Sequence, residues 1–124
     1  MGFKFSDNKI HFEFEGKTFK VDAAKCTVWL KTSLGVIQKA QNILKGCAHD
    51  ADLTEEQIEE VLSGFVTVFD DLLGKGATKK IFGERLVSFY DCYDMYAYIV
   101  TEIKAFAVNK RKGVLDGGKE LYSR

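Results

Sequence analysis

The sequence has no proline in 124 residues, and this absence already restricts the fold. Proline interrupts helices, so a chain without it suits a structure made mainly of helix. Histidine is scarce, with only His11 and His49. The three cysteines, Cys26, Cys47 and Cys92, form no CxxC pair. An odd number of cysteines without paired spacing favours reduced thiols in a reducing compartment such as the cytoplasm.

Long apolar runs and a net charge are absent too. The start, "MGFKFSDNK", lacks the apolar run of a signal peptide, and no stretch approaches the ~20 residues that span a bilayer. Basic and acidic residues number 18 each, so no overall field attracts nucleic acid or an anionic membrane. We expect neither as a partner. The charge is nevertheless uneven, with acid in Asp50–Glu60 and base in Lys104–Lys112.

A catalytic or metal site needs reactive groups that converge, and the sequence offers few. Cys47 and His49 lie together in a predicted loop, but structural zinc needs four ligands and the other cysteines fall in predicted helices. Asp70 and Asp71 are neighbours on a predicted helix and point about 100° apart, so we expect them to be solvated on its outer side. The sequence therefore predicts no enzyme activity, no metal and no cofactor.

The first 22 residues predict a β-hairpin. "KIHFEFEGKTFKV" alternates with period two, and Glu15-Gly16 forms the turn. A lone hairpin is only marginally stable in water, so it must pack on helices, gain a strand from Phe3–Phe5, or join another subunit's sheet. One face of the hairpin is apolar and consists of Ile10, Phe12, Phe19 and Val21.

The remainder predicts helices, because apolar residues recur at spacings of three and four. We expect long helices over residues 23–45, 55–73 and 86–108, with one short helical turn between the last two. The resulting fold is α+β, mainly α, in a single domain over residues 1–124. It has a hairpin (1–22), a helical core (23–108) and a C-terminal tail (109–124). The tail has three glycines and no period, so we expect it to be mobile.

Local signals mark the helix boundaries. Asp22 is placed to cap the first helix, and Thr54 with Gln57 matches a capping box at the start of the second. Gly46 falls where a left-handed C-terminal cap belongs. Gly35 in mid-helix costs about 1 kcal/mol relative to alanine, so we expect it to mark a close helix crossing.

The segment "FDDLLGKGATKKIFG", residues 69–83, contains glycines and a lysine but does not match a phosphate-binding loop. Such a loop needs its glycines ahead of the lysine and after a strand. Here an amphipathic helix precedes them. We interpret the segment as a helix that ends at Gly74, followed by a helical turn that Thr78 caps and Gly83 closes. We then expect Ile81 and Phe82 to pack against the end of the helical core.

The same segment, preceded by an amphipathic helix and an N-terminal hairpin, resembles a family of small phage and prophage proteins of Gram-positive bacteria. In that family an FDELFGEG-type segment runs into a KIFG-type segment. Its members are taken to be tail assembly chaperones or tail assembly proteins. They end in a strongly basic tail, whereas here only Lys110, Arg111 and Lys112 match before a glycine-rich end.

The resemblance implies a protein of the bacterial host cytoplasm that acts during the assembly of long tails. Its main partner would be the tape-measure protein, which is long, helical and prone to aggregate. The tail-tube protein, which assembles around the tape measure, would be a second partner. The family motif itself supplies no binding residues.

Side-chain type and periodicity, rather than the motif, select the residues for partner binding. We expect the acidic stretch Glu55–Glu60 to select basic partners. Large aromatic side chains on the helix stripes can serve a partner interface or simply pack in the core. The candidates are Trp29, Phe65, Phe69, Tyr90, Tyr93 and Tyr96.

Two other functions stay open. A structural component of the tail would lend the edge of its hairpin to a neighbouring copy and build a ring, as a homo-oligomer. A small nucleic-acid-binding regulator would use "NKRK", residues 109–112, to bind phosphates. Three basic residues without a groove-entering motif favour instead a solvated helix C-terminus, where cations suit the helix dipole.

Overall fold

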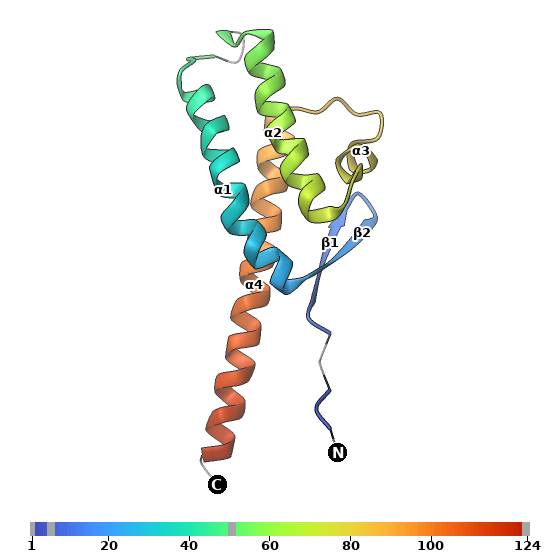
Figure 1. Cartoon of the computed structure of the whole chain (residues 1–124), viewed down its shortest axis with the longest axis vertical. Helices are drawn as coiled ribbons and strands as arrows, with labels where there is room; N and C mark the ends of the chain where they lie inside the picture. Colours follow the sequence, from blue (N-terminus) through green and yellow to red (C-terminus); the bar gives the residue numbers. More distant parts are fainter. Residues whose placement is uncertain (1, 5–6, 50–51, 123–124) are drawn as a thin grey trace.

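An N-terminal hairpin and four helices make up the described part of the chain (Figure 1). The computed structural model describes residues 2–4, 7–49 and 52–122, with side chains up to Lys112. This architecture confirms the predicted α+β, mainly α fold. The elements are β1 (Lys9–Phe14), β2 (Lys17–Asp22), α1 (Ala23–Lys45), α2 (Glu55–Leu73), α3 (Ala77–Phe82) and α4 (Phe89–Tyr122).

The hairpin has the predicted register, with Phe12 opposite Phe19. Glu15 and Gly16 both have positive φ, as a two-residue turn that matches the strand twist requires. Of the three ways to support the hairpin, the structure contains packing on helices: α4 lies against β1, and the Glu13 N–H donates to Tyr98 Oη at 3.0 Å. The described sheet has two strands, and Phe5 of the alternative third strand lies outside the described residues.

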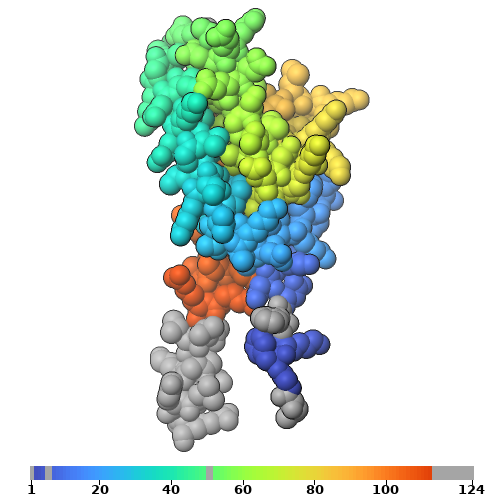
Figure 2. All heavy atoms as spheres, viewed as in Figure 1, coloured from blue at the N-terminus to red at the C-terminus, as the bar shows by residue number. Residues whose placement is uncertain are grey.

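The helices α1 and α2 lie side by side and cover α4, while α3 closes the space between α2 and the hairpin (Figures 1 and 2). One apolar core joins all six elements. Burial of such side chains is the main source of the fold's stability, at ~25 cal/mol per Å² of apolar surface. The largest fully buried side chains are Phe12, Phe65, Phe69, Leu72, Ile99, Val61, Cys26 and Cys92.

The boundary signals were right at α2 and partly wrong at α1. Thr54 and Gln57 form the reciprocal capping box. Asp22 occupies the N-cap position of α1, but its side chain makes no capping hydrogen bond, so that prediction is wrong. Gly46 has a right-handed φ of −72° rather than a left-handed one, because the last turn of α1 tightens and continues into Cys47.

The close helix crossing lies at Gly64, not at Gly35. A Cβ on Gly35 would have no atom within 4 Å, so the predicted crossing there is wrong. A Cβ on Gly64 would lie 3.1 Å from Val36 Cγ1. Gly64 therefore lets α2 approach α1.

Residues 69–83 form a structural junction, with two corrections to its predicted details. Gly74 ends α2 as expected, and Ile81 and Phe82 are buried. Thr78 lies inside α3 rather than capping it. The Asp70 carboxylate is not solvated: it accepts hydrogen bonds from the Thr78 N–H (2.9 Å), the Thr78 hydroxyl (2.7 Å) and the Gly76 N–H (3.3 Å). Asp70 thus supplies the cap that the sequence assigned to Thr78.

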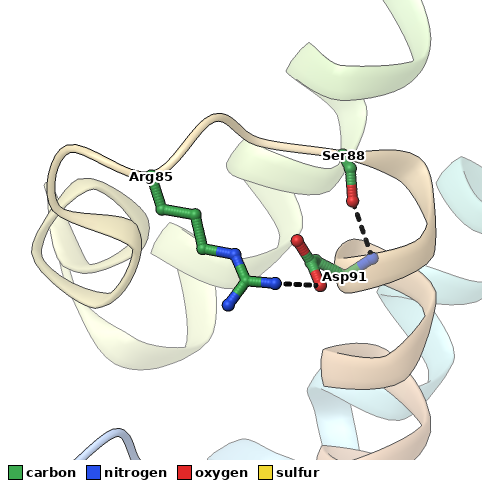
Figure 3. Close-up of polar contacts among 3 residues, drawn as sticks. All are labelled: Arg85, Ser88 and Asp91. Atoms are coloured by element: carbon green, nitrogen blue, oxygen red, sulfur yellow. Dashed lines mark hydrogen bonds and ion pairs between the residues drawn. The ribbon is translucent and has the colours of Figure 1, made fainter.

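The helix α4 begins later and ends later than predicted. Ser88 Oγ accepts a hydrogen bond from the Asp91 N–H, and the Asp91 carboxylate pairs with Arg85 at 3.1 Å (Figure 3). Leu86 therefore lies before the helix and is 89% exposed. Glycine weakens a helix by about 1 kcal/mol without ending it, and α4 continues through the predicted tail to Tyr122. The mobility of residues 109–124 stays a prediction.

Candidate partner-binding surface

Three of the six predicted contact residues lie in the core. Trp29, Phe65 and Phe69 are 4%, 1% and 0% exposed. The Trp29 indole N–H donates to the Val68 carbonyl at 2.8 Å, which fixes α1 to α2. A partner cannot reach these side chains while the protein is folded, so of the two roles that the sequence left open for them, the structure shows packing in the core. Periodicity identifies a core stripe as readily as a binding face.

The tyrosines divide between packing and exposure. Tyr93 meets the edge of the Phe65 ring at 5.1 Å between centroids, and burial raises the pKa of its hydroxyl. Tyr96 packs on Trp29 at 5.4 Å, and its hydroxyl shares a hydrogen bond with Ser33. Both are half-buried. Tyr90, at 70% exposed, is the candidate that stands on the surface.

An apolar groove that the sequence did not predict runs along the outer side of α2. Ile58, Leu62 and Val66 are half-buried and follow one another at spacings of four, so they form a single stripe. Val87, from the connection between α3 and α4, also lines the groove. The volume is about 600 Å³. The signal was present in the sequence, because α2 has more apolar residues than one core-facing stripe requires.

One end of this groove is acidic. Glu55 and Glu59 line it, and Glu56 is exposed beside them in the sequence "EEQIEE" at the start of α2. Glu60 pairs with Lys39 of α1 at 3.1 Å. Carboxylates at a helix N-terminus stabilise the helix dipole, and here they also border an apolar surface. The α2 groove therefore combines apolar and acidic recognition groups.

A second hollow of about 280 Å³ lies between the hairpin turn, α3 and α4. Glu13, Asp91 and Asp94 are among its lining residues, and Arg85 pairs with Asp91. Within the described residues no three His, Cys, Asp or Glu side chains are grouped to hold a metal ion.

The buried thiols offer little nucleophilic character. Burial raises the pKa of Cys26 to about 11 and that of Cys92 to about 12, so both are protonated at neutral pH. Cys47 is half-buried. None of the helices in the described part of the chain has the length and apolar content of a membrane span.

Comparison with known protein families gives a match over most of the chain. Residues 13–120 match the model of a family described as "Family of unknown function (DUF6673)". The chain belongs to the DUF6673 family. The match extends from inside β1 into the last turns of α4, so the groove of this DUF6673 chain lies wholly within it. No curated protein and no solved structure matches the chain.

Proposed function

We propose that this protein is a non-enzymatic phage tail assembly chaperone that binds the tape-measure protein in the cytoplasm of the bacterial host. It would hold the tape measure until the tail-tube protein assembles around it. The proposal starts from the resemblance of residues 69–83 to that family. The bonds of Asp70 and the burial of Ile81 and Phe82 give this segment a structural role, which is compatible with a motif that has no catalytic chemistry.

The observation that carries the proposal is the α2 groove. A stripe of half-buried apolar side chains with glutamates at one end fits an amphipathic helix with an apolar face and basic residues beside it. Covering such a helix removes from water the surface through which tape-measure chains would aggregate. In this proposal the acidic stretch Glu55–Glu60 selects basic partners, as predicted from the sequence. The apolar contacts with the partner come from Ile58, Leu62 and Val66 instead of the aromatic side chains that lie in the core.

The test is an affinity capture of the tagged protein from cells that produce tails, with bound proteins identified by mass spectrometry. We expect recovery of the tape-measure protein and absence of the chaperone from finished tails. The double substitution Leu62→Asp and Val66→Asp should lower recovery roughly ten-fold, because it places charge in the apolar contact. Recovery of no tail protein by the unaltered chain would refute the proposal.

A matched control is available on α1. Val28 and Leu34 are exposed apolar side chains, at 60% and 50%, and lie outside the groove. Val28→Asp with Leu34→Asp makes the same chemical change and should leave recovery within about two-fold, as surface substitutions usually have small effects. Circular dichroism verifies that both variants are folded. Tyr90→Ala in the same assay tests the exposed aromatic candidate.

The alternative function is a structural component of the tail that oligomerises through its hairpin. The bond from Glu13 to Tyr98 engages the outer edge of β1, which leaves β2 as the edge for such a contact. Mass spectrometry of purified tails separates the two functions, since a structural component stays in the particle and a chaperone does not.

A further inference from the structure

The sequence suggested that the basic residues of α4 stabilise the C-terminal end of a helix dipole, and the structure does not fit that explanation. Residues 104–112, "KAFAVNKRK", contain four basic residues and no acidic one. Cations at a helix C-terminus would suit the dipole, but that effect is confined to the last turn. Since α4 continues from Lys112 to Tyr122, the basic residues lie well before its end. The helix dipole therefore does not account for them.

Within this stretch Phe106 packs against the core, and Lys110 Nζ lies 5.7 Å from the centroid of the Phe106 ring. Lys104, Lys110, Arg111 and Lys112 are exposed, and none forms an ion pair with another residue whose side chain the structure describes. Val108 is 63% exposed. Figure 2 shows this orange-red part of α4 leaving the body of the protein below α1. Residues 104–112 thus form a projecting helical surface that is basic and partly apolar.

The acidic start of α2 is complementary to this projection. "EEQIEE", residues 55–60, has four acidic residues and no basic one. The apolar stripe from Ile58 to Val66 and the basic stretch from Lys104 to Lys112 each cover about 12 Å of helix. They lie toward opposite ends of the molecule, because α2 begins at one end and α4 runs toward the other (Figure 1). A projection therefore cannot reach the groove of its own chain.

We infer that the projecting part of α4 in one copy docks in the α2 groove of a second copy and covers that groove while no client is bound. The inference rests on the proposed function for the meaning of the groove as a client site, but the contact between copies does not require it. Such a contact is heterologous, because a different surface of each copy takes part. It leaves one groove and one projection unoccupied in each pair, so it extends to chains or closes to a ring.

Sedimentation velocity of the purified full-length protein tests the contact. We expect assemblies that grow with protein concentration at about 0.1 M salt and dissociate at about 1 M salt, where the Debye length falls from about 10 Å to about 3 Å. A protein that stays monomeric at every concentration at the lower salt would overturn the inference.

Charge reversal identifies the surfaces. Glu55→Lys with Glu59→Lys reverses both glutamates that line the groove, and Lys110→Glu with Arg111→Glu reverses two of the four basic side chains of the projection. Each variant alone should associate roughly ten-fold more weakly, because the substituted side chains then face like charges on the unaltered surface of the other copy. An equal mixture of the two should restore assembly, since each reversed surface again meets its opposite. Lys25→Glu with Lys31→Glu on the exposed side of α1 is the matched control, and it should associate like the unaltered chain.

The outcomes separate this inference from the proposed function. Variants that assemble unchanged would assign self-association to another surface, such as the edge of β2, and would overturn the contact. Mixing that fails to restore assembly would do the same. A monomeric protein that still captures the tape measure would remove only this inference, whereas charge-restored assembly without tape-measure capture would remove only the proposed function.

Discussion

Asp70 connects the end of α2 to the start of α3 through a single carboxylate. Its two oxygens accept three hydrogen bonds across the turn that contains Gly74 and Gly76. Both glycines have positive φ, a conformation in which a side chain would be strained. The short α3 has only six residues, too few to be stable alone. Its position therefore depends on this carboxylate and on the burial of Ile81 and Phe82.

Replacing Asp70 by alanine should lower the free energy of unfolding by about 2–3 kcal/mol, because three donors lose a charged acceptor. Asp71→Ala is the control: Asp71 is the exposed neighbour, and its loss should change stability by less than about 0.5 kcal/mol. Urea titration followed by circular dichroism measures both. Equal effects of the two substitutions would contradict the role given to Asp70.

At the scale of elements, the close approach of α1 and α2 depends on Gly64, whereas Gly35 of α1 faces open space. Gly35→Ala should raise the free energy of unfolding by about 0.5–1 kcal/mol, because alanine favours helix and its Cβ meets open space. Gly64→Ala should raise the free energy of unfolding by a smaller amount, or lower it, because its Cβ would press on Val36. Thermal unfolding of each variant gives the comparison.

Combining Gly64→Ala with Val36→Ala removes the crowding and provides the internal check. In the Val36→Ala background, Gly64→Ala should become more favourable than in the unaltered chain. If its effect is the same in both backgrounds, the contact with Val36 does not limit the approach of the helices.

The elements differ in how far the sequence predicts them, for physical reasons. The hairpin follows from period and turn together, since a slip of one residue would expose Phe12. The capping box at Thr54 involves neighbouring residues only, so the sequence predicts it. The sequence does not predict the groove, because apolar residues surround much of α2 and periodicity does not show which stripe meets the core. The bonds of Asp70 depend on backbone angles at two glycines, which the spacing of residues does not specify.

At the scale of the whole molecule, a single core makes unfolding cooperative. Trp29 bonds to Val68 of α2 and packs on Tyr96 of α4, so the sole tryptophan reports on three helices at once. We expect its fluorescence and the far-ultraviolet circular dichroism to give the same midpoint in urea. Clearly separated midpoints would mean that part of the helical structure unfolds independently of this core.

The bond between Glu13 and Tyr98 has a consequence for the order of synthesis. Its partners are 85 residues apart, and a ribosome adds about 5–20 residues per second. The hairpin therefore emerges about 4–17 s before the helix that engages β1 has been made. During that interval its apolar face has no α4 to cover it. The contact between β1 and α4 can form only after residue 98 has been made, and a nascent chain that stalls before residue 98 leaves the outer edge of β1 open to other strands.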